Sequence, residues 1–126
     1  MSAEGERKSV MSKEVKDLAP PKDDPITLEE LAKCDGTDEN RPTYLAIKGI
    51  VFDVSRNAMY KPGGSYHLFA GKDASRGLAC SSLKLEDARP EWHDLSDSQK
   101  KTLDDWFNFF KKRYNIVGKV VGATNL

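Results

Sequence analysis

Tyrosine, histidine and apolar side chains crowd into one short stretch of this chain, residues 60–78, which read YKPGGSYHLFAGKDASRGL. Phenol and imidazole groups can hydrogen-bond the polar edge of a ligand or coordinate a metal that the ligand carries. The apolar neighbours favour a flat apolar body behind that edge. The sequence contains no Ser/His/Asp set, metal-ligand cluster or phosphate-cradling loop. The stretch therefore predicts a binding site rather than the active site of a hydrolase or a phosphoryl-transfer enzyme.

Turn and capping residues divide this stretch into short elements. Pro62 fixes one backbone angle and the two glycines after it permit positive ones, which predicts a tight turn. Ser65 is then expected to cap a short helix over residues 66–69, and Asp73 to cap another over residues 74–76. The two helices would meet at a glycine corner, with tyrosines, one histidine and apolar residues along their inner side.

The same residues resemble a known family. Tyr66 is followed by FAG at residues 69–71 and by DASRGL at residues 73–78. This order resembles the membrane-associated progesterone receptor family, a branch of the cytochrome b5-like haem/steroid-binding domains. The resemblance covers about residues 25–121 and is supported by three further blocks, YLAIKGIVFDV at 44–54, LSD at 95–97 and YNIVGK at 114–119.

The resemblance implies an α+β fold of the cytochrome b5-like type, in which a small mixed sheet carries short helices that form an open ligand cleft. The domain is expected to span residues 25–126. The implied cofactor is haem b, with the tyrosinate of Tyr66 as the axial ligand of the iron. The residues that the resemblance places at the cofactor are Tyr60, Tyr66, Asp73, Arg113 and Tyr114.

The histidines argue against the electron carrier that shares this fold. Cytochrome b5 proper holds haem between two histidines, the first in a His-Pro-Gly-Gly turn. Lys61 takes that position here, and no histidine lies near Leu85, where the second would fall. A pair made from His67 and His93 would need a different geometry. Tyr66 is the better ligand, because phenolate is a recognised axial ligand of ferric haem. The alternative is an ordinary half-buried core tyrosine.

Four residues are expected at the edge of the implied site, and two of them, Arg113 and Asp73, also have a simpler structural explanation. The hydroxyls of Tyr60 and Tyr114 would donate to the ligand tyrosine or to a haem propionate. Arg113 stands where the family has a lysine, and its guanidinium would pair with a propionate or remain a solvated charge at a helix end. Asp73 would contact the ligand or cap a helix.

Capping signals and periodicity predict the elements that carry the site. Thr27 precedes a short helix, and residues 43–54 are typical of a β-hairpin with a glycine-containing turn. Ser96 and Gln99 form a capping-box pattern at the start of the clearest helix. Residues 116–121 are expected to form a closing strand.

Apolar side chains in the second half of the chain are expected in the core. Within the helix that starts at Ser96, the apolar spacing favours domain core over a steroid pocket for Leu103, Trp106, Phe107 and Phe110. Leu83 and Leu85 are also expected against the core, and residues 85–88 in a turn.

Composition limits the class of protein. The chain has 126 residues, 38% of them apolar, which suits one small soluble domain. Basic and acidic residues number 20 each, so no overall field attracts nucleic acid. No run approaches the roughly 20 apolar residues of a membrane span. A cytoplasmic location is expected, with association with the endoplasmic reticulum through a partner or through an anchor absent from this chain.

The remaining segments carry no chemistry of their own. Residues 1–24 lack apolar periodicity and end in a cluster of prolines, which predicts a disordered tail or linker. Cys34 and Cys80 have neither metal-type nor redox-type spacing, so two reduced thiols are expected.

These observations predict a binding protein and not an enzyme. A haem held by Tyr66 with an open sixth position could be held for delivery, and the resemblance implies that the protein binds and supports haem-thiolate sterol monooxygenases. The alternative is a steroid- or sterol-binding module without haem, since the same cleft and hydroxyls would serve a sterol. The open face of the haem also predicts a haem-dependent homodimer.

Overall fold

A two-residue turn at Lys48 and Gly49 organises the sheet in the computed structural model, which describes residues 20–125. Both residues have positive φ, 54° and 77°, as a type I′ hairpin turn requires. The turn joins strand β2 (Tyr44–Ile47) to strand β3 (Ile50–Asp53), and the two strands pair antiparallel. The predicted hairpin is therefore confirmed.

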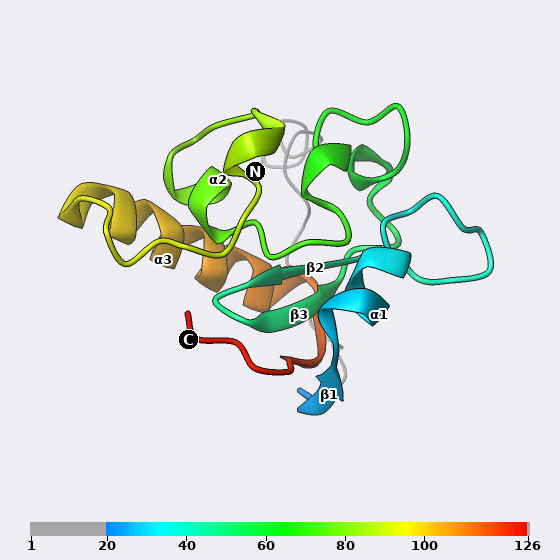
Figure 1. Ribbon diagram of the computed structural model, residues 1–126. Coiled ribbons are helices and arrows are strands. Elements are labelled where there is room, and N and C mark those ends of the chain that lie inside the picture. Colours follow the sequence, from blue (N-terminus) through cyan, green and yellow to red (C-terminus); the bar gives the residue numbers. More distant parts are fainter. Residues whose placement is uncertain (1–19, 126) are drawn as a thin grey trace, which may run out of the picture.

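Two more strands complete the sheet. Strand β4 (Asn115–Val120) pairs antiparallel with β3, and strand β1 (Asp24–Ile26) pairs parallel with β4, so the strand order is β1-β4-β3-β2. The sheet is therefore mixed and the fold is α+β, as the sequence predicted (Figure 1).

Strand β1 lies where the sequence predicted the end of a tail. Asp24 begins the strand, and the Lys22 N–H already donates to the Ile116 carbonyl oxygen at 3.0 Å. The strand has only three residues and shows no alternating pattern, which is why the sequence did not indicate it. Pro25 is tolerated because β1 is an edge strand. Residues 1–19 of the predicted tail lie outside the described residues.

The larger helical layer covers one face of the sheet. Helix α3 (Asp97–Arg113) packs against the sheet and against helix α2 (Ser75–Ala79). Phe52 of β3 and Phe110 of α3 are both fully buried in this layer, with ring centroids 5.5 Å apart in an edge-on arrangement. The aromatic helix therefore supplies core residues, as predicted.

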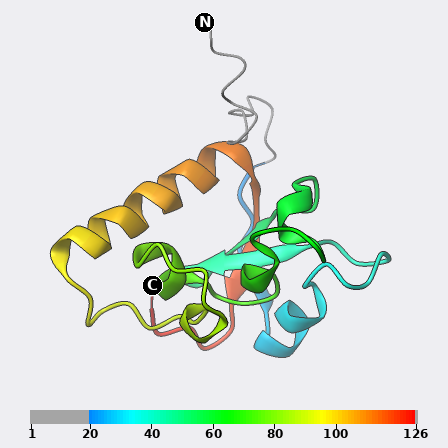
Figure 2. The same ribbon diagram turned by 90° about the horizontal axis from the view of Figure 1, so that it is seen from above.

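A shorter helix covers the opposite face. Helix α1 (Leu28–Lys33) buries Leu31 completely in a cluster with Val51 of β3. The turned view shows α3 and α1 on opposite sides of the sheet (Figure 2). Both faces are therefore covered, and the chain between β3 and α3 is left to build a binding site.

The segment that links the parts of that site follows the edge of β2. The Gly71 N–H donates to the Tyr44 carbonyl at 2.7 Å, and the Ala46 N–H donates to the Lys72 carbonyl at 2.9 Å. The Ala74 N–H then donates to the Ala46 carbonyl at 2.9 Å. The turns before Gly71 and the helix after Ala74 are therefore both attached to the sheet at this edge.

The predicted starts of the two main helices are confirmed. The Thr27 hydroxyl oxygen accepts from the Glu30 N–H at 3.0 Å at the start of α1. At the start of α3, Ser96 Oγ accepts from the Gln99 N–H at 3.2 Å, and Gln99 Oε1 accepts from the Ser96 N–H at 3.0 Å. This is the reciprocal capping box that the sequence pattern indicates.

The prediction that Ser65 caps a helix is wrong. The chain forms only a 3₁₀ turn over His67–Phe69, with Tyr66 at its N-cap position and without a side-chain cap. The Tyr66 N–H donates to the Met59 carbonyl at 2.9 Å, so the chain folds back onto the preceding 3₁₀ turn, Ala58–Tyr60. The hydrogen bond from the Tyr66 N–H to Met59, and not a side-chain cap at Ser65, therefore holds the start of this turn.

The predicted packing of two leucines on the core is also wrong. Leu83 is 60% exposed and Leu85 is 64% exposed. They lie in a loop that is closed on itself, because Ser82 Oγ donates to Asp87 Oδ2 at 2.6 Å. The predicted turn at Leu85–Asp87 is present as a 3₁₀ turn.

The absence of a side chain at Gly118 lets β1 lie against β4. A Cβ at this position would lie 2.3 Å from the Asp24 carbonyl oxygen and 2.7 Å from Ile26 Cδ1. Distances this short mean that any larger residue must displace the neighbouring strand.

Gly118→Ala should therefore push β1 away from the sheet. We expect the free energy of unfolding, measured by urea denaturation, to fall by about 1–3 kcal/mol. Lys119→Ala, at the neighbouring exposed position, is the control and should change this free energy by less than about 0.5 kcal/mol. Equal stability of the two variants would show that β1 does not pack as described.

Candidate functional site

A hollow of about 220 Å³ lies between the turns that precede Gly71 and helix α2. Its lining residues come from these turns, from α2 and the segment after it, and from α3: Tyr60, Tyr66, Phe69, Gly77, Leu78, Ser81, Ser82, Leu83 and Trp106. We call this hollow the tyrosine cleft. Among the residues that the structure describes, no charged side chain lines it. Small-molecule pockets usually exceed roughly 300 Å³, so a flat ligand would be only partly enclosed.

An aromatic wall forms one side of the tyrosine cleft. The rings of Tyr66 and Phe69 stack with centroids 6.1 Å apart and an interplanar angle of 20°. Residues three apart eclipse one another in a 3₁₀ turn, which explains why these two rings face the same way. The Tyr60 ring lies 5.7 Å from the Tyr66 ring, so both phenols border the same space.

The Tyr60 hydroxyl is a buried polar group without a partner. Tyr60 is only 4% exposed, and among residues 20–125 no hydrogen bond to its hydroxyl is formed. Burial, with smaller effects from Tyr114 and Tyr66, raises the pKa of Tyr60 well above its ordinary value. The phenol therefore stays protonated and can donate. Since buried polar groups are nearly always paired, this hydroxyl indicates a ligand.

His67 faces away from the tyrosine cleft. Its Nε2 lies 3.0 Å from the Asp35 carbonyl oxygen, at the end of α1. The approach is close because Gly71 lacks a side chain: a Cβ there would lie 2.7 Å from Asp35 Cβ. His93 stacks on Trp92 with ring centroids 4.1 Å apart and does not line the cleft either.

Tyr114 and Arg113 do not line the tyrosine cleft. Tyr114 is 3% exposed, and its hydroxyl accepts from Asn57 Nδ2 at 2.9 Å. Arg113 Nη1 donates to the Phe109 carbonyl at 3.2 Å, and the guanidinium lies 3.8 Å from the centroid of the Phe109 ring. Of the residues that the sequence placed at the cofactor, the structure brings only Tyr60 and Tyr66 together in the cleft.

Asp73 is also absent from the lining of the cleft, and its carboxylate is fully used elsewhere. Oδ1 accepts from the Ser75 N–H at 3.1 Å and from the Ser75 hydroxyl at 2.6 Å, while Oδ2 accepts from the Gly49 N–H at 2.9 Å. The expected cap is present in part, because Asp73 does bind the first amide of α2 although Ala74 holds the N-cap position.

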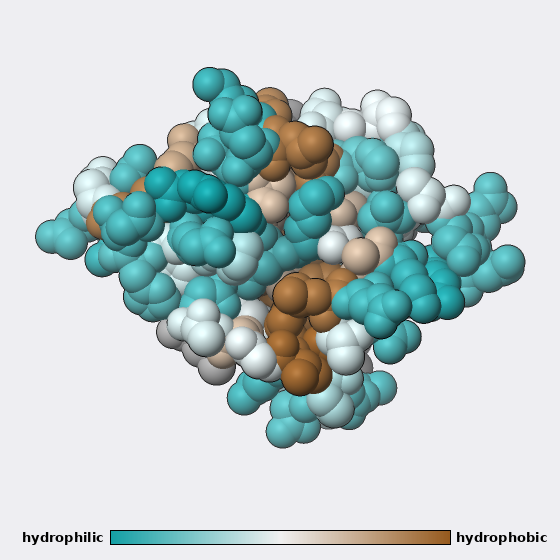
Figure 3. All heavy atoms as spheres, viewed as in Figure 1, coloured by the Kyte–Doolittle hydropathy of each residue, from teal (hydrophilic) through white to brown (hydrophobic). Residues whose placement is uncertain are grey.

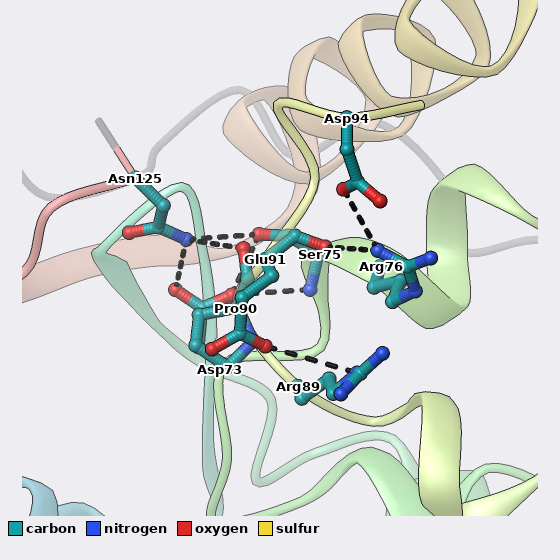
Figure 4. A network of polar contacts seen from close by, with 8 residues as sticks. All are labelled: Asp73, Ser75, Arg76, Arg89, Pro90, Glu91, Asp94 and Asn125. Atoms are coloured by element: carbon teal, nitrogen blue, oxygen red, sulfur yellow. Dashed lines mark hydrogen bonds and ion pairs between the residues drawn. The ribbon is translucent and has the colours of Figure 1, made fainter. Parts of the chain in front are cut away.

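Asn125 completes this network from the other end of the chain (Figure 4). Its Nδ2 donates to Asp73 Oδ2 at 2.9 Å and to the Pro90 carbonyl at 3.1 Å. Its backbone carbonyl oxygen accepts from Trp92 Nε1 at 2.8 Å. Asn125 is 5% exposed. It therefore ties the C-terminal segment to the start of α2, whose Gly77 and Leu78 line the cleft.

Three lining residues of the cleft, Ser81, Ser82 and Trp106, were not predicted from the sequence as site residues. Trp106 packs against the core, as expected, but it is half-buried and also lines the cleft. Ser81 and Ser82 carry no motif, and no pattern in the sequence marks them as lining residues.

The donor set fits a ligand held by a phenol better than a metal ion held by the protein alone. Among residues 20–125, no cluster of three or more His, Cys, Asp and Glu side chains is arranged for a metal. Cys34 and Cys80 are free thiols, and burial raises the pKa of Cys34. A haem, which brings its own four nitrogen ligands, would need only an axial donor, and the cleft is lined by two residues with a phenol group, Tyr60 and Tyr66.

A second apolar area lies where α1, β1 and the C-terminal segment meet (Figure 3). Leu28 is 61% exposed and Val121 is 51% exposed, and the hollow between them has a volume of about 190 Å³. Its buried polar groups, Asp73 and Asn125, already satisfy each other. The tyrosine cleft is therefore the better candidate site. Within the described part of the chain, no helix has both the length and the apolar character to cross a bilayer.

Residues 27–119 match the family model described as "Cytochrome b5-like Heme/Steroid binding domain". The chain is 47% identical over 97 residues to Arabidopsis thaliana "Probable steroid-binding protein 3", a match that takes in 76% of this chain and 97% of that protein. It is 41% identical over 100 residues to human "Membrane-associated progesterone receptor component 2", covering 76% of this chain and 44% of the relative. The chain thus spans less than half of the human protein.

A solved structure shows the same architecture. A hypothetical protein from Arabidopsis thaliana, described as having a cytochrome b5 like fold, superposes with a TM-score of 0.72 at 40% sequence identity. The alignment covers 86% of this chain and 100% of that one. The fold predicted from the sequence is therefore confirmed.

Asn125→Asp should convert a stabilising contact into a repulsion. The new carboxylate would face that of Asp73, and two carboxylates in one site raise the pKa of one of them. The folded protein then binds an extra proton that the unfolded chain releases, so stability must fall as the pH rises through the carboxyl range. Thermal unfolding between about pH 4 and pH 8 would measure this.

Asn125→Ala provides the matched control for that titration. It loses the amide without adding charge, and should cost about 1–3 kcal/mol with no additional pH dependence. If the two variants show the same pH profile, the Asp73–Asn125 contact is not as close as described.

Proposed function

The chain belongs to the family of cytochrome b5-like haem/steroid-binding domains, and on that basis we propose that it binds haem b in the tyrosine cleft, with the tyrosinate of Tyr66 as axial ligand of the iron. The observation that carries this proposal is the pair of phenols in the cleft: Tyr66 on its wall, and beside it the buried, unpartnered hydroxyl of Tyr60. The bound haem would supply an iron centre with one protein ligand.

The choice of Tyr66 over a histidine rests on where the side chains point. His67 binds the Asp35 carbonyl behind the aromatic wall, and His93 lies on Trp92. Tyr66 borders the cleft and its ring is held by stacking on Phe69. Among the described residues that line the cleft, the tyrosines alone carry a group suited to ferric iron.

Tyr60 has a supporting role in this proposal. Its hydroxyl remains protonated because burial raises its pKa, so it can donate to the oxygen of Tyr66 or to a polar group of the ligand. A hydrogen bond donated to a phenolate stabilises the charged form. Tyr114, whose charge would affect Tyr60, would act behind it. Arg113 would pair with a propionate after leaving its contact with Phe109.

The cellular role is proposed from the family resemblance. A haem that is partly enclosed and held by one protein ligand suits a protein that holds haem for delivery, or one that binds and supports haem-thiolate sterol monooxygenases. The names of the relatives describe binding proteins. The proposal therefore assigns no catalytic residue to this chain.

A second candidate is a steroid- or sterol-binding module without haem. The observation that favours it is that no charged side chain of the described part of the chain lines the cleft, which suits an uncharged ligand better than a dicarboxylate. Relatives carry steroid-binding names, which supports the same class of ligand. Both candidates use the same cleft, and the two tyrosine hydroxyls serve either ligand.

Tyr66→Phe separates these candidates. It removes the axial oxygen but keeps the ring that stacks on Phe69, so the fold should be retained. The rate of haem dissociation is measured by transfer of the haem to an apo-globin acceptor. This rate should increase by more than roughly 10- to 100-fold, which is the loss of metal affinity expected when only a supporting contact to a metal ligand is removed. A steroid should still bind, because its apolar body keeps the same contacts.

His67→Ala is the control for the Tyr66 experiment. It should cost about 1 kcal/mol of stability through the lost contact with Asp35, while haem dissociation changes much less than in Tyr66→Phe. If the histidine variant loses haem and the tyrosine variant keeps it, the assignment of the ligand is wrong.

Loading with haem should also create a surface for association. Leu83 lines the cleft and is 60% exposed, and exposed apolar surface of this kind, together with an uncovered haem face, would tend to be covered. Sedimentation across a dilution series should show a monomer without haem and concentration-dependent dimers with it. An exogenous iron ligand that occupies the open face should suppress the dimer. Identical monomers in both forms would argue against this interface.

A further inference from the structure

Ser81 ends helix α2 in a backbone conformation that serine rarely adopts. Its φ is +52°, in the left-handed region where glycine is usual. The Ser81 N–H donates to the Leu78 carbonyl at 3.3 Å, and the Ser82 N–H donates to the Gly77 carbonyl at 2.9 Å. These are the two hydrogen bonds of a Schellman motif, in which glycine normally occupies the position of Ser81 because a Cβ there costs free energy.

The side chain of Ser81 adds nothing to the end of the helix. Within the part of the chain that the structure describes, no hydrogen bond to the Ser81 hydroxyl is formed. The neighbouring Ser82 differs, since its hydroxyl donates to Asp87 Oδ2 at 2.6 Å and accepts from the Lys84 N–H at 3.1 Å. A strained residue that persists without a local partner is a reason to look for a functional role.

The position of Ser81 supplies that role, because it lines the tyrosine cleft on the side opposite Tyr60 and Tyr66. Ser81 itself is exposed, whereas the Tyr60 hydroxyl is buried. The cleft therefore has neutral hydrogen-bonding groups both in its interior and at its rim.

We propose that Ser81 is a specificity residue, whose hydroxyl hydrogen-bonds a neutral hydroxyl or carbonyl group at the outer edge of a flat apolar ligand in the tyrosine cleft. This inference rests on the second proposed function, in which the cleft takes a steroid or sterol. It adds that Ser81 contacts the outer polar edge of that ligand, while the Tyr60 hydroxyl remains available to a second polar group at the inner end.

The charges around Ser81 favour a neutral group over a carboxylate. The Asp87 carboxylate is bound to the adjacent Ser82, and Glu86 lies exposed in the same loop. Glu86 and the cation of that loop, Lys84, are both exposed to solvent, where their charges are screened, so the half-buried Asp87 is the least screened charge of the loop. Among residues 20–125, no cation lines the cleft itself. A ligand edge that carries carboxylates, such as the propionate edge of haem, would therefore point away from Ser81.

Three substitutions separate the backbone of Ser81 from its hydroxyl. Ser81→Gly removes both the strain and the hydroxyl, and should raise the melting temperature. Ser81→Ala removes the hydroxyl but keeps the strained Cβ, so the melting temperature should not rise. Ser81→Asn tolerates positive φ and keeps a hydrogen-bonding group. If Ser81 serves only the end of the helix, none of the three should alter ligand affinity.

The affinity of each variant is measured for two steroids that differ by one hydroxyl, 5α-cholestan-3β-ol and 5α-cholestane, both delivered from cyclodextrin. Quenching of tryptophan fluorescence reports binding, because Trp106 lines the cleft. The unsubstituted protein should bind the alcohol about tenfold more tightly than the hydrocarbon, as one net hydrogen bond allows. Ser81→Gly and Ser81→Ala should both abolish this preference by weakening the alcohol alone, and Ser81→Asn should retain most of it.

Three results would overturn the proposal. One is a preference for the alcohol that survives in the glycine and alanine variants. Another is a preference that disappears in Tyr60→Phe instead, which would place the hydroxyl at the inner end of the cleft. The third is a failure of the unsubstituted protein to bind either steroid.

Binding of iron protoporphyrin IX to the same variants distinguishes this proposal from the haem assignment. Its affinity should stay within about twofold in all three variants, since each retains Tyr66 and the ligand's carboxylates point elsewhere. A parallel loss of haem and alcohol affinity would mean that Ser81 meets a carboxylate, against the proposal. If the unsubstituted protein binds no haem but shows the Ser81-dependent preference, the haem assignment fails and the role of Ser81 is supported.

Discussion

A buried carboxylate without a cation determines how the loops of this domain are arranged. Asp73 is 5% exposed, and within the described residues it forms no ion pair; donors from Gly49, Ser75 and Asn125 surround it instead. Burial of an uncompensated charge costs several kcal/mol, so the segments that bring these donors are held in place together. They are the hairpin turn, the start of α2 and the C-terminal segment. The position of α2, and with it one wall of the tyrosine cleft, follows from this requirement.

The opposite wall is held by close packing rather than by charge. Gly71 allows the chain to approach Asp35, and His67 binds the Asp35 carbonyl, which leaves Tyr66 on the side of the cleft. Because the two walls depend on separate contacts, the cleft is formed before any ligand enters it. The buried hydroxyl of Tyr60 is then the group whose hydrogen bonding a ligand can complete, and this links the fold to the proposed binding function.

The sequence predicted what depends on neighbours along the chain. The caps at Thr27 and Ser96 and the turn of the hairpin are set by residues a few positions apart, and all three are confirmed. It did not predict contacts between distant segments, such as the bond from Asn125 to Asp73, 52 positions away. The family resemblance singled out Tyr66, and Tyr66 lines the cleft. The resemblance could not show that Arg113 packs on Phe109, or that Trp106 lines the cleft as well as packing on the core, since both depend on how α3 lies against the sheet.

The central claim is that the oxygen of Tyr66 binds the iron of a haem in the tyrosine cleft. The most direct measurement is the absorption and resonance Raman spectrum of the unsubstituted protein loaded with ferric haem. Our account predicts a high-spin ferric spectrum with a phenolate-to-iron charge-transfer band, and enhancement of tyrosinate ring modes on excitation within that band. A low-spin spectrum typical of two histidine ligands, or the unchanged spectrum of free haem, would contradict it.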